Sequence, residues 1–360
     1  VDLSDRLAAP LRDEIVTKLR TMMQSIQTPI KDRAAAGEIL DALGWLPDDL
    51  DAFVFVPGAG NKRGWVELDG SVGSLPTPNP LNSTNSRLSG ERGFWIAKYP
   101  VTNYQFQRFI DAGGYENEKY WRNQRGVDEK GHEKNLKNEA WDWLKGAGGA
   151  ERRPWQWDNP RFHRAGYPVT GVTWYEAAAY CAWLTEQFMI SDLGFMIDGS
   201  ASGNHKSEIL NHKFIARLPT EAEWVRAAGG EQDDRYPWDA ENPKSQLPTS
   251  NLQSLISNVV ARANVKESEI GGTTPVAMYP DGKRVTETGD EIWDLAGNVW
   301  EWTSTLYEGY PGAYVRGGSW YNDANASSVS SRVNWGRYLD YHVVGLRVVV
   351  ASPNFPPVVL

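Results

Sequence analysis

The chain carries 17 tryptophans and 15 tyrosines among 360 residues, and this aromatic content restricts how it can fold. Indole and phenol rings are large and rigid, and each carries a polar atom that needs a partner when the ring is buried. Such side chains are poorly suited to filling one regular aliphatic core. We therefore expect an irregular, loop-rich fold whose interior is divided into small aromatic clusters.

Charge and cysteine content argue against several classes of protein. The net charge is −9, and an acidic field repels phosphate, so no nucleic-acid partner is expected. Cys181 is the only cysteine, which excludes an intramolecular disulfide and a thiolate metal cluster. No apolar run reaches the ~18 residues of a membrane helix, and the N-terminus does not resemble a signal peptide. These features predict a cytoplasmic protein without membrane insertion.

The N-terminal segment is predicted to be helical. Apolar residues recur at three- and four-residue spacing from Leu7 to Met22, which is typical of one helix face. Pro29 interrupts this helix, and a second helix is expected over about 31–43. We therefore divide the chain into a helical segment, residues 1–50, and one larger domain, residues 51–360. A scaffold or signalling role for the N-terminal helices is an alternative function.

Short strands and capped helices are predicted in the larger domain. Strands are expected at Phe53–Val56 and Phe94–Tyr99. Helices are expected over Tyr104–Ala112, from Thr173, and over Glu221–Ala228. Thr220 and Glu223 have the spacing of a capping box, which satisfies two free amides at a helix start. Residues 229–290 are rich in Pro, Asn and Gly and are predicted to be mostly loop.

Six short segments of the chain resemble the formylglycine-generating-enzyme family and follow that family's order. They are F-V-F-V-P-G at Phe53, G-F-W-I-A-K-Y-P-V-T-N at Gly93, Y-P-V-T-G-V-T-W-Y-E-A-A-A-Y-C-A-W-L at Tyr167, R-L-P-T-E-A-E-W at Arg217, I-W-D-L-A-G-N-V-W-E-W at Ile292, and R-G-G-S-W with G-L-R-V-V at Arg316 and Gly345. The resemblance implies an α+β domain with the irregular C-type-lectin-like fold of the formylglycine-generating-enzyme subtype.

The family's reactive cysteines are missing from this chain. Members that oxidise sulfatase cysteines use a cysteine pair between the G-G-S and G-F-R motifs, where thiolates bind copper and carry the oxygen chemistry. The corresponding residues, 320–344, contain no cysteine. Cys181 lies on the apolar face of a predicted helix and is expected to act as a small buried hydrophobe. We therefore expect a protein that is not an enzyme and has no catalytic cofactor.

An enzyme of the same fold that uses a metal without cysteine is the alternative function. Such a metal-dependent oxidoreductase would take acidic and histidine ligands from separate loops. The five histidines are His132, His163, His205, His212 and His342. None of them forms a His-Glu-x-x-His motif or another local metal-binding spacing.

The segment from Tyr321 to His342 carries the strongest functional signal. Tyr, Trp, Ser, Asn and Asp dominate it, as in antibody paratopes, where rigid rings supply contact area and small polar groups supply adaptable hydrogen bonds. The segment lies between G-G-S-W and G-L-R-V-V, and this arrangement resembles the variable proteins of diversity-generating retroelements. The predicted ligand-binding residues are Tyr321, Asn322, Asp323, Asn325, Ser327, Ser328, Ser330, Asn334, Trp335, Arg337, Tyr338, Asp340, Tyr341 and His342.

The resemblance therefore implies a non-enzymatic ligand-binding protein whose C-terminal variable surface recognises a protein or another surface ligand. It also implies structural calcium, held by side-chain oxygens of Asp294 and Glu301 and by backbone carbonyls of Gly297 and Val299. A second calcium site of the family would use Asn251 and the carbonyl of Leu252. Ser268 stands where that second site has an aspartate, and a hydroxyl is a poorer calcium ligand.

Overall fold

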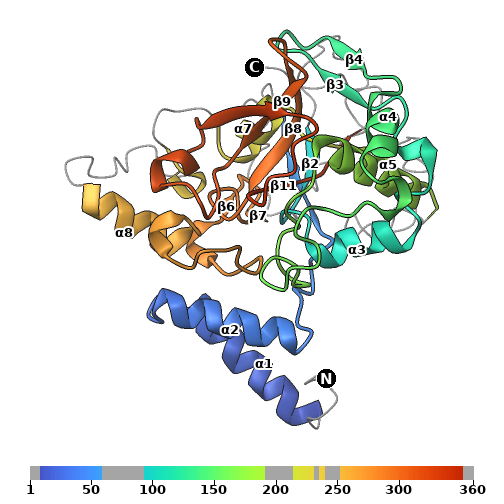
Figure 1. Ribbon diagram of the computed structural model, residues 1–360. Coiled ribbons are helices and arrows are strands. Elements are labelled where there is room, and N and C mark those ends of the chain that lie inside the picture. Colours follow the sequence, from blue (N-terminus) through green and yellow to red (C-terminus); the bar gives the residue numbers. More distant parts are fainter. Residues whose placement is uncertain (1–8, 59–92, 191–213, 231–234, 240–251, 352–360) are drawn as a thin grey trace, which may run out of the picture.

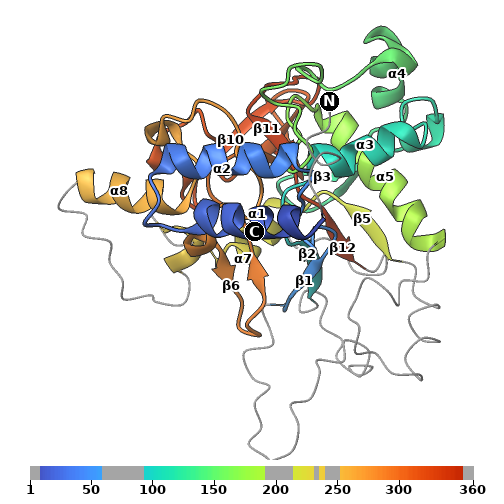
Figure 2. The same cartoon turned by 90° about the horizontal axis from the view of Figure 1, so that it is seen from below.

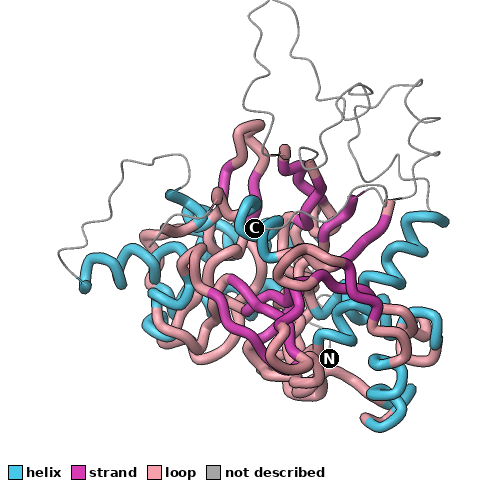
Figure 3. Tube along the Cα trace, turned by 90° about the horizontal axis from the view of Figure 1, so that it is seen from above, coloured by secondary structure: helices cyan, strands magenta, loops and turns pink. Residues whose placement is uncertain are grey.

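The computed structural model describes residues 9–58, 93–190, 214–230, 235–239 and 252–351. Strands run through the middle of the molecule and helices lie around them (Figures 1 and 3). None of the helices in these ranges has both the length and the apolar character needed to cross a membrane. The molecule is a mixed α+β structure in which most segments outside the sheets are loops and short turns.

Helices form largely where hydrophobic spacing and capping residues predicted them. The α-helices are α1 Ala9–Gln24, α2 Ile30–Ala42, α3 Asn103–Asp111, α4 Glu139–Gly146, α5 Trp174–Ile190, α7 Glu221–Ala227 and α8 Leu252–Arg262. The 3-10 turns are η3 Glu118–Tyr120, η4 Gly149–Glu151, η6 Pro237–Asp239, η7 Lys266–Ser268, η8 Pro280–Gly282 and η9 Ala324–Ser327. Thr102 and Thr220 each begin a helix with a complete capping box, and the one at Thr220 confirms the sequence prediction.

The N-terminal helices α1 and α2 pack side by side against one edge of the larger domain (Figures 1 and 2). The buried guanidinium of Arg33 joins them to it, donating to the carbonyls of Met23 at 2.8 Å and Met278 at 2.6 Å. Gly37 allows close approach, because a Cβ there would lie 2.6 Å from the Pro275 ring. Both predicted helices are confirmed, and the division at residue 50 stays a prediction.

The first sheet joins segments from the two ends of the domain. Its strand order is β1-β2-β12-β5, with antiparallel pairing throughout. The strands are β1 Phe53–Val56, β2 Phe94–Ala97, β12 Val349–Ala351 and β5 Ile215–Arg217. The last described strand thus lies between one of the first strands and one from the middle of the chain.

The second sheet carries the C-terminal segment of interest. Its order is β10-β9-β8-β3-β4, and β11 pairs in parallel with β8. The strands are β10 Arg332–Gly336, β9 Gly312–Arg316, β8 Trp300–Tyr307, β3 Arg125–Val127, β4 Glu133–Asn135 and β11 Val344–Leu346. A separate hairpin pairs β6 Arg284–Val285 with β7 Glu291–Ile292.

The prediction that residues 229–290 are mostly loop is wrong for part of that range, because α8 occupies Leu252–Arg262. Leu255 and Val259 are four residues apart and both pack in a small cluster with Tyr236 and Val265. The helical spacing was therefore present in the sequence. The Pro, Asn and Gly residues on either side of this short stretch masked the signal.

Aromatic side chains fill the largest core cluster, as their abundance predicted. Phe106 of α3 stacks on Tyr180 of α5 with ring centroids 5.5 Å apart, and Phe109 lies edge-on to the same tyrosine at 6.0 Å. Trp302 of β8 is fully buried, and its indole N–H donates to the carbonyl of Val172 at 2.9 Å. The buried indole thus obtains the hydrogen-bond partner that its polar atom requires.

A buried ion pair between Arg347 and Glu301 lies where the two sheets meet. Arg347 Nη2 lies 2.7 Å from Glu301 Oε1, and the two side chains are 0% and 1% exposed. Trp224 of α7 donates its indole N–H to Glu301 at 2.7 Å. Arg347 also donates to carbonyls at the end of β2 and just after β7, those of Ala97, Lys98, Trp293 and Asp294. The guanidinium therefore links two strands and a loop from separate parts of the chain.

Replacing Arg347 by Met should reduce the free energy of unfolding by about 3–5 kcal/mol, because Glu301 would remain buried without its partner. Urea unfolding measures this loss. The matched control is Arg125→Met, which breaks the exposed pair with Glu133 and should cost less than about 1 kcal/mol. Equal losses in the two variants would contradict a central role for the buried pair.

Candidate functional site

The predicted variable segment leaves the second sheet after β9 and returns to it as β10 and β11. Gly318 makes the first turn of this path with φ of +74°, and a Cβ there would lie 2.3 Å from Ser327 Oγ. Only glycine fits both the angle and the close approach. The chain then forms η9, and β10 pairs with β9 from Arg332 to Gly336. The turn at Gly318 thus holds the start of the segment, and its later part is held by the second sheet through β10 and the adjoining β11.

Five of the predicted contact residues are exposed on this segment. Tyr321, Tyr338 and Tyr341 are 62%, 53% and 42% exposed, which is unusually open for rings of this size. Asp323 and Asn325 are exposed on η9 and the residue before it. These five side chains can contact a ligand without any rearrangement of the fold.

Three predicted contact residues are buried. Ser327 is 0%, Ser328 6% and Arg337 7% exposed. Arg337 Nη2 pairs with Glu139 of α4 at 2.6 Å, and the same carboxylate accepts the hydroxyl of Tyr175. In this structure the three side chains belong to the support of the segment and do not reach its outer surface.

Several half-buried members of the segment are held by hydrogen bonds. Asn322 Oδ1 accepts from the Trp300 indole at 2.8 Å and from Ser319 Oγ at 2.6 Å. Asp340 pairs with Arg152 at 2.6 Å. Asn334 accepts from the hydroxyl of Tyr310, and Ser330 lies 3.3 Å from Ser328 Oγ. Apart from Ser328, these partners come from β8 and from loops outside the segment, and they restrict the conformations that the segment can adopt.

Trp335 is partly buried and supports the segment from within. Its ring lies 6.0 Å from that of Trp300, 6.4 Å from that of Trp302 and 5.3 Å from that of Tyr341. The side chain packs against the main core cluster. Trp335 therefore contributes to stability as well as to any contact with a ligand.

His342 ends the segment within an aromatic cluster that the sequence analysis missed. Its ring centroid lies 5.3 Å from that of Trp155, 5.7 Å from that of Phe162 and 5.4 Å from that of Trp320. Burial, assisted by the charge of Arg161, lowers the pKa of His342 below its usual value. The pair of tryptophans in R-R-P-W-Q-W was the available signal in the sequence, but it lies in a stretch without periodicity.

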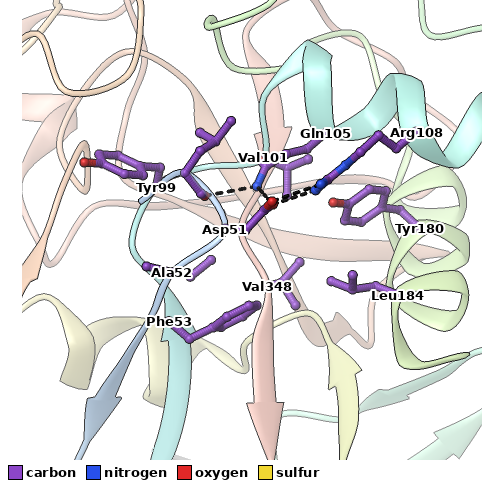
Figure 4. Close-up of a pocket in the computed structure, with 12 residues that line it drawn as sticks. Asp51, Ala52, Phe53, Tyr99, Val101, Gln105, Arg108, Tyr180, Leu184 and Val348 are labelled. Carbon is purple, nitrogen blue, oxygen red and sulfur yellow. Dashed lines mark hydrogen bonds and ion pairs between the residues drawn. The ribbon is translucent and has the colours of Figure 1, made fainter. Parts of the chain in front are cut away.

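A small cavity elsewhere in the domain has a structural role. Its volume is about 30 Å³, and Leu184 and Val348 are among the side chains that line it (Figure 4). Arg108 pairs with Asp51 at 2.5 Å, and Gln105 donates to the same carboxylate. Burial acts to raise the pKa of Asp51, but these hydrogen bonds outweigh it and hold the pKa below its usual value. A space of this size holds about one water molecule, so it is no substrate pocket.

The family described as sulfatase-modifying factor enzyme 1-like domain (FGE-sulfatase) matches residues 48–352, which is most of the chain. The chain belongs to this family. The irregular C-type-lectin-like α+β fold that the six motifs predicted is therefore confirmed. Here the family domain carries the segment 321–342 on the second sheet.

Curated relatives of this family domain include enzymes and a protein named as inactive. Formylglycine-generating enzyme of Mus musculus is 29% identical over 251 residues, covering 66% of this chain and 57% of the relative. Hercynine oxygenase of Mycolicibacterium thermoresistibile is 27% identical over 326 residues, covering 76% and 58%. Inactive C-alpha-formylglycine-generating enzyme 2 of Bos taurus is 27% identical over 285 residues, covering 75% and 81%. The chain spans little more than half the length of the first two.

Two solved structures resemble the domain weakly. Treponema denticola variable protein 1 has a TM-score of 0.40 and 20% identity, with 72% of this chain and 84% of that chain covered. PvdO from Pseudomonas aeruginosa has a TM-score of 0.40 and 18% identity, with 83% and 92% covered. Similarity at this level carries no argument about what the domain binds.

The single thiol of this FGE-sulfatase domain is buried in helix α5. Cys181 is 2% exposed on α5, within the main core cluster. Burial raises the pKa of its thiol well above the usual value, so the reactive thiolate is disfavoured. This agrees with the expectation that Cys181 acts as a small buried hydrophobe.

The residues predicted to hold calcium already have other partners. Both oxygens of Glu301 accept hydrogen bonds from Arg347, and one also accepts from Trp224. Asp294 accepts the amide of Ala277 at 3.2 Å, and burial raises its pKa to about 6, with a further contribution from the charge of Glu301. As arranged, the set does not fit calcium unless Arg347 leaves Glu301. Calcium at Asp294, Gly297, Val299 and Glu301 stays a prediction from the resemblance.

Other metal sets also lack support in the described ranges, where no three His, Cys, Asp or Glu side chains are grouped to hold a metal ion. His132 bonds to Asp128 in the β3–β4 turn, and His163 stacks on Trp157 with ring centroids 4.1 Å apart. His205, His212 and Asn251 lie outside the described residues.

Truncating Trp335 and Tyr338 in separate variants should distinguish a ring that stabilises the fold from a ring that is only exposed to solvent. Trp335→Ala removes a ring that packs on the core and should lower the free energy of unfolding by about 3 kcal/mol or more. Tyr338→Ala removes an exposed ring and should change it by no more than about 0.5 kcal/mol. Urea unfolding of the two variants tests the difference. A large loss in Tyr338→Ala would mean that the exposed ring supports the fold.

Proposed function

We propose that this chain is a non-enzymatic binding protein that displays residues 321–342 as its recognition surface. The observation that carries the proposal is the exposure of the rings of Tyr321, Tyr338 and Tyr341 on a segment that hydrogen bonds and an ion pair hold to the domain. Exposed aromatic rings on a rigid support are typical of recognition surfaces, because little conformational freedom is lost on binding. The ligand is a protein or another surface.

The position of the single thiol supports binding over thiol-based oxidation. Cys181 is buried in α5, and no cysteine occurs in the segment. One relative bears the name of an inactive formylglycine-generating enzyme 2, which is consistent with a family that includes members without that activity.

Diversification of this surface is the second part of the proposal. A segment that varies in sequence must keep its support while its outer side chains change. The supporting residues Ser327 and Arg337 are buried, whereas Tyr321, Tyr338 and Tyr341 are exposed. We therefore infer a retroelement-diversified variable protein in which the exposed positions vary and the supporting positions do not.

Sequencing this gene across a population of its source cells tests diversification. We expect substitutions concentrated at codons for exposed residues of 321–342, above all Tyr321, Asp323, Asn325, Tyr338 and Tyr341. Codons for buried residues such as Ser327 and Arg337 should stay constant, since substitutions there cost stability. The adjoining strands β9 and β11 are the internal control. A uniform segment would contradict diversification.

A metal-dependent oxidoreductase is the second candidate function, and the names of the formylglycine-generating enzyme and hercynine oxygenase relatives favour it. Elemental analysis of the purified protein separates the two. We expect copper and iron well below one equivalent per chain. A stoichiometric redox metal, retained through purification, would contradict the binding proposal, whereas calcium alone would support only a structural ion.

A further inference from the structure

A hollow borders the proposed recognition surface on the side of His342. Its volume is about 470 Å³, and residues Arg152–Asn159 line it. Trp155 is 43% exposed at its rim and contacts His342. The amide of Trp155 donates to the carbonyl of Gly171, whose own amide donates to Tyr341. These backbone hydrogen bonds fix the position of the hollow relative to the C-terminal end of the segment.

Arg161, two residues beyond the lining of this hollow, supplies a positive charge that acts on His342. Its guanidinium lies 5.7 Å from the ring of Phe162 and 5.9 Å from that of Trp320. A Cβ at Gly271 would lie 2.8 Å from Arg161 Nη2, so the guanidinium also lies close to that backbone. Within the described part of the chain it pairs with no carboxylate. By contrast, Arg152 is neutralised by Glu176 and Asp340.

Two polar atoms in the same cluster have no hydrogen-bond partner among the described residues. They are Nε1 of Trp320 and Nδ1 of His342. Trp320 is only 9% exposed, and its ring lies 5.4 Å from that of His342. A buried indole N–H normally finds an acceptor, and it can act only as a donor. Tyr321 and Arg161, which are both exposed, contact the Trp320 ring.

We propose that this corner binds a carboxylate carried on an apolar or aromatic body. The carboxylate pairs with Arg161 and accepts the Trp320 indole N–H, while the body packs on Trp155 and Tyr321. Small displacements of the exposed Tyr321 and Arg161 side chains open access to the indole. The inference rests on the proposed function, because Tyr321 and His342 belong to the recognition surface, and it assigns that surface a ligand chemistry.

Aromatic clusters also bind cations by cation–π attraction. Here Arg161 already lies over the rings of Phe162 and Trp320, and its charge repels a second cation. Asp158 also lines the hollow and is exposed. Its charge acts on His163, whereas the charge that acts on His342 is that of Arg161. The groups that touch Trp320 therefore favour an anion.

Titration of the ¹⁵N-labelled full chain with benzoate tests this site by the indole N–H signals. Trp320→Phe, which keeps a ring in place, identifies the Trp320 signal. We expect benzoate to move that signal downfield, as a new hydrogen bond does, with saturable binding. Benzyl alcohol and benzylamine carry the same ring without the carboxylate and should leave the signal in place.

Arg161→Gln should weaken benzoate binding about tenfold or more, because it removes a charge-assisted hydrogen bond. Arg20→Gln, at an exposed arginine of α1, is the matched control and should bind as the unchanged chain does. Benzylamine binding, an unmoved Trp320 signal, or equal benzoate affinity in Arg161→Gln would each overturn the carboxylate site.

Failure of this site and failure of the proposed function remain distinguishable. If the codons for 321–342 are diversified but benzoate does not bind, the recognition surface stands and the carboxylate site is rejected. If benzoate binding depends on Arg161 but the segment is uniform in the population, the carboxylate site stands and diversification is rejected.

Discussion

The buried pair of Arg347 and Glu301 is the interaction on which the rest of the arrangement depends. Removing two charges from water is costly, and the cost is offset only when further hydrogen bonds satisfy both groups. Here they do, through Trp224 and four backbone carbonyls from β2 and the residues after β7. The pair thereby sets where the two sheets meet. A second pair, Arg316 with Glu221 of α7, fixes the other end of the segment 321–342. The segment starts just after one buried arginine and ends just before the other.

Much of the fold was predictable because its signals are local. The capping box at Thr220 and Glu223 and the apolar spacing of α1 depend only on neighbouring residues, and both predictions are confirmed. The helix α8 was missed because turn-forming residues surround a short apolar repeat. Burial of Ser327 and Arg337 could not be predicted, since it depends on Gly318, Glu139 and the packing of α4. The composition of a segment indicates which contacts it can make, whereas the residues that pack against it decide which of its side chains reach the surface.

The segment 321–342 is therefore a mixture of two kinds of residue. Some, such as Asn322 and Asp340, are bound by groups outside the segment, from the Trp300 indole to the Arg152 guanidinium. Others, such as Tyr338, extend into solvent. Residues from the loop before α5 add to this surface through Trp155 and its contact with His342. Recognition would then involve side chains that change with the segment together with side chains of the unchanging framework.

The place of β11 and β12 in the two sheets has a consequence for protein synthesis. Both strands follow the segment 321–342 in the chain, yet β11 pairs with β8, and β12 lies between β2 and β5. Neither sheet is complete until the ribosome has read through the segment in frame, and Arg347 is also translated only after it. A stop codon or a frameshift introduced by mutation of the segment would leave both sheets open, with unpaired strand edges. In the diversified population that we propose, the order of translation would act as quality control, since truncated variants would lack strands of both sheets.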